Sequence, residues 1–258
     1  MLTLEQIQQQ YPQNLRSFPR SLLREYLQYK ILEIIFASEY ASKLVFIGGT
    51  ALRIAHDNNR FSEDVDFDNF GLTDAEFKQT SYKVKAGLEA EGFKVEIDFK
   101  GKESYRCEVR FPGLLFGSSL SAHQSENILV QIDSLAQSFS YQPERKILNK
   151  FDVFTEIFTP SSELLLSQKI NAVFTRKRAK GRDFYDIIFL LSFTRPNYQF
   201  LEQKWNIGEP ESLRAKLVEL SSKLNFTELA KDVEKFLFNP GDSKKVLLFS
   251  EFIKQAKL

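Results

Sequence analysis

The chain has 258 residues, enough for one large domain or two modest ones. Apolar residues make up 43% and charged residues 27%, which is ordinary for a globular protein. The net charge of +1 excludes a basic surface over the whole chain, so any nucleic-acid footprint has to be local.

The first part of the chain alternates helical and strand patterns. Helical spacing of apolar residues, with Pro19 near its start, predicts a long first helix. Thr73 as N-cap and Gly92 as stop frame a second amphipathic helix. Short apolar or alternating runs predict strands, with a short helix at 50–57 after the first of them. These strands cover residues 43–47, 64–70, 93–101, 104–111 and 127–135, and "KGKES" joins the third and fourth as a hairpin-sized loop.

From about residue 159 the pattern becomes helical throughout. Thr159-Pro160 is a helix-start signal. The helical segments cover residues 159–178, 182–193, 210–224, 225–238 and 242–258. The sequence therefore predicts an α+β part over residues 1–155, with a mixed sheet flanked by helices, and a helical region over residues 156–258.

Three aspartates alternate along the strand "DVDFD". Because successive side chains of a strand point to opposite faces, Val65 and Phe67 face a core, and Asp64, Asp66 and Asp68 form a row on the other face. Like charges in a row repel, and a divalent cation relieves that repulsion. Mg²⁺ prefers oxygen ligands and takes one or two carboxylates plus substrate phosphates.

A glycine-rich turn precedes these acids. Gly48, Gly49 and Thr50 stand between a strand and a helix, where glycine permits a sharp turn and a close ligand. Free N–H groups at a helix start favour a phosphate. The two motifs together predict a phosphate cradle beside a metal platform.

Two further aspartates are candidates for a third carboxylate. "VEID" ends at Asp98 and "VQID" ends at Asp133, and in both the aspartate lies opposite an apolar face. Periodicity does not choose between them.

Cations gather in the helical region. Lys169 and Arg176 are seven residues apart, so with Ala172 between them they share one helix face that suits a triphosphate. "TRKRAKGR" then places five cations in eight residues: Arg176, Lys177, Arg178, Lys180 and Arg182. This turn is the place for a polyanion in an otherwise neutral chain.

The motifs "GGTALRIAHDNNRFSEDVDFD" and "SELLLSQKINAVFTRKRAKGRDFYDIIFLL" carry a family resemblance. The first resembles the signature of polymerase-β-type nucleotidyltransferases. Both resemble one branch of that superfamily, the AbiEii/AbiGii-type toxins of abortive-infection, type IV toxin–antitoxin systems. The resemblance implies a nucleotidyltransferase fold whose helical region completes an active-site cleft.

The resemblance also implies roles for single residues. Asp64 and Asp66 hold Mg²⁺ or Mn²⁺, and the third acid after the hairpin favours Asp133. Lys169 joins the catalytic set with one of Asp183 and Asp186, between which the sequence does not decide. The nucleotide contacts then comprise Gly48, Gly49, Thr50, Arg60, Ser62, Lys169, Arg176 and Arg182.

The expected reaction is nucleotidyl transfer from a nucleoside triphosphate to RNA, such as a tRNA 3′ end. An antitoxin encoded nearby is the expected partner, and direct binding to it is not required. Two alternatives remain: a protein or small-molecule acceptor, or a binding module without catalysis. The second is disfavoured by the intact Gly-Gly-Thr turn and Asp-X-Asp pair.

Targeting signals and cysteines point to the cytoplasm. The first residues lack the basic and apolar regions of a secretory signal, and no stretch approaches 18 apolar residues. The single cysteine, Cys107, excludes an internal disulfide, and we expect it in the core. His56 and His123 have no catalytic partner pattern, so we expect them at helix ends or on the surface.

Overall fold

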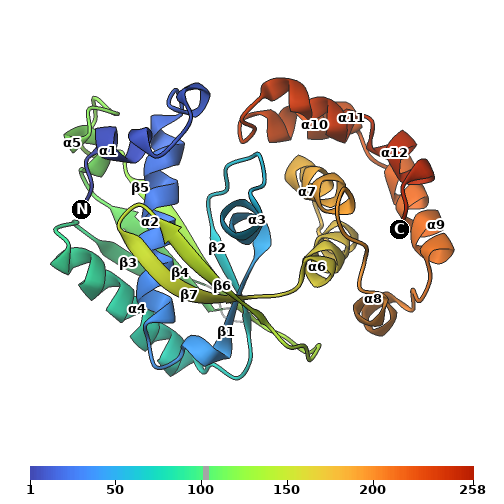
Figure 1. Ribbon diagram of the computed structural model, residues 1–258, viewed down its shortest axis with the longest axis horizontal. Coiled ribbons are helices and arrows are strands. Elements are labelled where there is room, and N and C mark those ends of the chain that lie inside the picture. The colour runs from blue at the N-terminus through green and yellow to red at the C-terminus, as the bar shows by residue number, and fades with distance from the viewer. Residues whose placement is uncertain (101–104) are drawn as a thin grey trace. The chain divides into compact units, whose positions relative to one another are not determined.

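The structure is a computed structural model that describes residues 1–100 and 105–258 (Figure 1). Most of the predicted loop "KGKES" lies outside the described residues. The chain forms two compact units. The first comprises residues 1–51 and 61–159, and the second comprises residues 52–60 and 160–258. The short segment 52–60, which the sequence pattern assigns to the α+β part, thus belongs to the helical unit.

The first unit contains a five-stranded mixed sheet of order β1-β2-β5-β4-β3. Its strands are β1 (Leu44–Ile47), β2 (Val65–Asn69), β3 (Glu96–Lys100), β4 (Tyr105–Phe111) and β5 (Ile128–Ala136). The β2–β5 pair is parallel and the other pairs are antiparallel. The predicted α+β class, the mixed sheet and the five predicted strands are confirmed.

Helices accompany this sheet. They are α1 (Leu4–Gln9), α2 (Pro19–Phe36), α3 (Gly48–His56), α4 (Asp74–Ala90) and α5 (Leu114–Gly117), with short 3₁₀ turns at Gln13–Leu15 and Ala41–Lys43. The Thr73 hydroxyl accepts a hydrogen bond from Glu76 N, and the Glu76 carboxylate accepts one from Thr73 N, so the predicted cap of α4 is a full capping box. His56 ends α3, and the residues of this helix from Leu52 onward already belong to the second unit.

The core of the first unit follows the predicted alternation. Val65 and Phe67 are buried on one face of β2, and Cys107 is buried on β4. A second hairpin, β6 (Glu144–Lys150) with β7 (Val153–Thr159), was not predicted because its exposed residues mix apolar and charged types. Phe36 of α2 contacts both Phe67 and Phe158, which joins this hairpin to the core.

The second unit is helical. It contains α6 (Ser162–Thr175), α7 (Gly181–Leu191), α8 (Tyr198–Trp205), α9 (Pro210–Ser222), α10 (Phe226–Glu234), a 3₁₀ turn (Pro240–Ser243), α11 (Lys244–Leu247) and α12 (Phe249–Gln255). The segment predicted as one last helix is therefore divided at Leu248, and α8 was not predicted. Phe184 packs edge-on against Phe226 and Phe249 in the core. Among the described helices none has the length and apolar character to span a bilayer.

Candidate active site

The aspartates of β2 and β5 form the centre of the first unit's polar face. Asp66 lies directly opposite Asp133 in the parallel β2–β5 register, and Asp133 lies opposite Arg106 in the antiparallel β5–β4 register. Neighbouring strands are about 4.8 Å apart, so the two carboxylates stand side by side on one face. Both are partly exposed, whereas Val65 and Phe67 beside Asp66 are buried.

Arg106 forks onto the Asp133 carboxylate. Its Nε donates to Oδ1 at 2.8 Å and its second terminal nitrogen donates to Oδ2 at 3.1 Å. Gln131 also donates to Oδ2 at 2.8 Å. The hydrogen bond to Asp133 raises the pKa of Arg106, burial opposes that shift, and the negative charges of Asp133, Asp64 and Asp66 add to it. Arg106 therefore lies in the field of all three predicted metal-binding aspartates.

The glycine-threonine turn lies against these acids. Gly48 has φ +80°, a conformation that side chains rarely adopt, and a Cβ there would stand 2.3 Å from Asp66 Oδ2. Gly48 thus makes room for the Asp66 carboxylate at the start of α3. The buried Thr50 hydroxyl donates to the backbone carbonyl of Asp64, so Thr50 fixes the backbone that carries the first acid. Gln28 holds the preceding loop by donating to Ser62 O at 3.0 Å.

The remaining strand aspartates differ from this pair. Asp68 is buried and accepts a hydrogen bond from the Tyr141 hydroxyl at 2.6 Å, so it does not continue an open carboxylate row. Asp98 lies on the edge strand β3, with β4 and β5 between it and β2. It pairs instead with Lys100 and Arg110. The strand order therefore places Asp133, and not Asp98, beside Asp66.

The donor set suits a hard divalent cation. Carboxylate oxygens are the ligands of Mg²⁺, which takes one or two of them and fills its shell with phosphate and water. Asp66 and Asp133 supply such a pair, and the lack of a side chain at Gly48 lets the Asp66 carboxylate lie against the start of α3. Within residues 1–100 and 105–258, no group of three or more His, Cys, Asp or Glu side chains is placed to hold a metal ion by itself. The pair Asp66 and Asp133 suits an ion that takes its other ligands from substrate phosphate and water.

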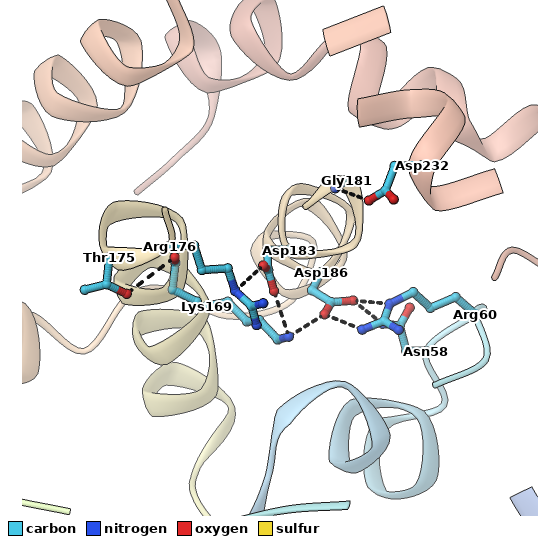
Figure 2. A network of polar contacts seen from close by, with 10 residues as sticks. Asn58, Arg60, Lys169, Thr175, Arg176, Gly181, Asp183, Asp186 and Asp232 are labelled. Carbon is cyan, nitrogen blue, oxygen red and sulfur yellow. Dashed lines mark hydrogen bonds and ion pairs between the residues drawn. The ribbon is translucent and has the colours of Figure 1, made fainter. Parts of the chain in front are cut away.

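The second unit holds a buried network of charges around Asp186 (Figure 2). Arg60 forks onto this carboxylate, with Nε to Oδ1 and a terminal nitrogen to Oδ2, both at 2.6 Å. Asn58 donates to Oδ1 at 2.8 Å. Burial pushes the pKa of Asp186 upward, but the charges of Arg60 and Lys169 outweigh it, and the pKa falls below its ordinary value.

Lys169 of α6 joins both aspartates of α7. Its ammonium lies 2.8 Å from Asp186 Oδ2 and 3.2 Å from Asp183 Oδ1 (Figure 2). Arg176 Nε lies 2.9 Å from the other oxygen of Asp183, as an ion pair whose angle departs from hydrogen-bond geometry. Three cations face two carboxylates, so the network carries one surplus positive charge.

Arg60 has no exposed side-chain surface, and its fork goes to Asp186. The nucleotide contact that we predicted for Arg60 stays a prediction; in the structure Arg60 holds Asp186 in place. The segment before it is held as well, because Arg60 pairs with Leu237 and Asn59 O accepts from Phe238 N. This explains why residues 52–60 belong to the helical unit.

The basic turn joins α6 to α7. Lys177 and Arg178 are exposed, whereas the Arg182 guanidinium lies over the Phe236 ring at 5.3 Å. Gly181 begins α7 where a Cβ would stand 1.9 Å from Leu229 O, so the turn is closed by a close helix contact. Its exposed cations are therefore Arg176, which pairs with Asp183, and Lys177 and Arg178, with Lys180 half-buried.

The sequence patterns did not predict four residues that hydrogen-bond to the predicted site residues. They are Arg106 on Asp133, Gln131 beside it, Asn58 on Asp186 and Gln28 on the Ser62 carbonyl. Arg106 shares the polar face of "SYRCEVRF", and this alternation was the available signal. The expectation that both units complete one cleft stays a prediction.

Comparison with solved structures identifies the fold class. The structure is similar to the crystal structure of an H. pylori protein described as a candidate nucleotidyltransferase. The TM-score is 0.57 at 18% sequence identity, covering 90% of this chain and 94% of that one. Paired aspartates beside a glycine turn on a mixed sheet thus belong to a nucleotidyltransferase fold.

The family follows from the sequence. Residues 30–237 match the family model described as "Nucleotidyl transferase AbiEii toxin, Type IV TA system". This match covers more than half of the chain, so the protein belongs to the AbiEii family of nucleotidyltransferase toxins. The family of type IV toxin–antitoxin systems implies an antitoxin partner. A comparison with curated proteins gave no match.

Proposed function

We propose that this protein transfers a nucleoside monophosphate from a nucleoside triphosphate to an RNA acceptor, such as a tRNA 3′ end. The proposed cofactor is Mg²⁺ or Mn²⁺, held by Asp64, Asp66 and Asp133. The supporting observation is the register that sets Asp66 opposite Asp133, with Gly48 against the Asp66 carboxylate. A cytoplasmic location and an antitoxin encoded nearby, which need not bind the toxin directly, belong to the same proposal.

The residues of the first unit would position the ion and the phosphates. Bound divalent ions neutralise a triphosphate and stabilise the attacking and leaving oxygens of an in-line displacement. Gly48 and Gly49 present backbone N–H groups at the start of α3, which favour an anion. Thr50 contributes indirectly, because its hydroxyl bonds the Asp64 carbonyl and so holds the loop of the first acid.

The second unit would supply phosphate contacts. Lys169 is held by two aspartates, which leaves one of its three N–H donors for a ligand. The surplus positive charge of the network favours an anion there. The exposed cations Lys177 and Arg178 suit an RNA backbone, because phosphate neutralisation is the main sequence-independent part of RNA affinity.

The test is a transfer assay with each of four labelled nucleoside triphosphates. Total bacterial RNA and total bacterial protein are offered separately as acceptors, with Mg²⁺ and with a chelator. We expect label in RNA, and only with the metal. Asp66→Ala should reduce transfer by at least about a hundredfold to a thousandfold, the order lost with one preorganised electrostatic group.

Asp98→Ala is the matched control for this variant. It removes a partly exposed aspartate from the same sheet, but from the edge strand away from Asp66. It should transfer at close to the wild-type rate. Retained transfer by Asp66→Ala would contradict the assigned site, and label in protein instead of RNA would contradict the assigned acceptor.

A further inference from the structure

A row of four charged residues crosses the sheet of the first unit. Strand register aligns Lys100 with Arg106, Arg106 with Asp133, and Asp133 with Asp66. The row therefore runs from two cations on β3 and β4 to two carboxylates on β5 and β2. Like charges are adjacent at each end, and the one opposite-charge step is the Arg106–Asp133 pair.

Arg106 is held by charge and not by packing. Its side chain is 42% exposed, and that of Asp133 is 21% exposed. Its fork uses one lone pair on each Asp133 oxygen, and its pKa shift shows that Asp64 and Asp66 act on it too. A pair that is partly exposed in this way can separate without opening the core.

The same carboxylates are those proposed to take a divalent ion. A guanidinium beside Asp133 and an ion bound between Asp66 and Asp133 would repel each other, because both seek the same negative charge. Loading the carboxylates therefore favours departure of Arg106 from its fork. A released guanidinium on this face is suited to phosphate, whose oxygens match its planar donors.

We propose that Arg106 is a counter-ion latch of the carboxylate site. In the metal-free protein it neutralises Asp133, and after an ion displaces it, it binds the triphosphate of the nucleotide. This inference rests on the proposed function, because it takes the same acids as metal ligands. Arg106 is thus a substrate-binding residue whose position reports whether the site is loaded.

The first test measures Mn²⁺ binding to the full chain by electron paramagnetic resonance, with no nucleotide present. Arg106→Gln removes the competing charge and should bind Mn²⁺ about tenfold tighter than wild type. Arg110→Gln is the matched control, because Arg110 lies four residues further along the same face of β4 and pairs with Glu108 and Asp98. It should leave the Mn²⁺ affinity unchanged.

The second test measures binding of tripolyphosphate at saturating Mn²⁺. Arg106→Gln should bind it about tenfold more weakly, because a charge-assisted hydrogen bond is lost. The opposite shifts for ion and polyphosphate are the signature of a latch, and a structural residue would weaken both. A single-stranded RNA oligonucleotide, titrated in parallel, should show the smaller change, and a loss confined to RNA would overturn the assignment to the nucleotide.

Arg106→Lys separates charge from geometry. It keeps the positive charge, so its Mn²⁺ affinity should stay within about threefold of wild type. Tightening equal to that of Arg106→Gln would overturn the latch. Asp66→Ala tests the proposed metal site on which this inference rests. If wild type and Asp66→Ala bind Mn²⁺ alike, the proposed metal site itself is wrong. If only Asp66→Ala loses Mn²⁺ and Arg106→Gln equals wild type, the latch alone fails.

Discussion

The two units contain the same chemical pair in opposite surroundings. In the first, Arg106 forks onto Asp133 with 42% and 21% of the side chains exposed. In the second, Arg60 forks onto Asp186, and neither side chain has any exposed surface. Both forks are bidentate, at 2.8 and 3.1 Å in the first unit and 2.6 Å in the second, and burial is what distinguishes a pair that can exchange partners from one that cannot.

The energetic consequences of this difference are large. An exposed ion pair contributes about 0–1 kcal/mol, because water solvates both partners when they separate. Removing one partner of a buried pair costs about 3–5 kcal/mol, because the other is left as an uncompensated charge. A ligand can therefore displace Arg106, whereas Arg60 stays with Asp186 and shapes the unit around it.

We expect the largest difference in stability between the variants Asp186→Asn and Asp133→Asn. We expect Asp186→Asn to lower the free energy of unfolding by about 3–5 kcal/mol, since it strands Arg60 and Lys169. Asp133→Asn should change it by no more than about 1 kcal/mol. The measurement is urea unfolding followed by circular dichroism and by fluorescence of Trp205, the single tryptophan, which lies in the second unit.

The loss of stability at low pH provides a second measurement of this prediction. The pKa of Asp186 is lowered in the folded state, so its contribution to stability is present above its unfolded pKa, about 4. That contribution disappears as pH falls through the lower folded value. Trp205 fluorescence should therefore show acid destabilisation that Asp186→Asn reduces. Equal unfolding free energies for the two variants would show that burial does not separate the pairs.

Local patterns predicted much of the fold. Alternation in "DVDFD" predicted the buried Val65 and Phe67, and the Thr73 cap and Gly92 stop predicted the bounds of α4. These features depend on neighbours within a few residues. The division of the last helix at Leu248 was not visible, because apolar residues continue on both sides of it.

Long-range pairings account for what the sequence did not reveal. "VEID" and "VQID" are equivalent in pattern, and strand order alone places Asp133 beside Asp66. Arg106 and Asp133 are 27 positions apart, and Arg60 and Asp186 are 126 apart, so no spacing rule connects them. A fork between distant residues becomes visible only when the strands and helices are assembled.

Lys169→Met measures what one cation of the buried network contributes to stability and to transfer. Without Lys169, Arg60 and Arg176 still balance Asp183 and Asp186, so the stability cost should be about 1–2 kcal/mol, below that of Asp186→Asn. Transfer should fall at least about tenfold for any acceptor, because a phosphate contact is lost. Transfer rate and urea unfolding are measured together.

Lys223→Met is the control for Lys169→Met. It removes a lysine of the same unit from an exposed pair with Glu219 and should change neither quantity. A Lys169→Met protein that transfers normally would limit Lys169 to a structural part in the network.

The smallest expected effect concerns Lys177, Arg178 and Lys180 in the turn between α6 and α7. Replacing Lys177, Arg178 and Lys180 by glutamine should weaken RNA binding and flatten its salt dependence. Each lost phosphate contact lowers the slope of log affinity against log salt by about 0.7 to 0.9. Nucleotide affinity should stay constant, because Lys169 remains in its network. The measurement is RNA binding at several salt concentrations, beside nucleotide binding at one.

A charge-matched control makes this slope interpretable. Glutamine at Lys223, Lys231 and Lys254, all exposed lysines of the same unit, removes equal charge elsewhere. If the turn acts as an RNA contact, only the turn variant should change the slope, because contact and not net charge releases counterions. Equal slopes in both variants and wild type would mark the turn as an ordinary solvated surface. The RNA acceptor would then lose the one local feature of this chain that supports it.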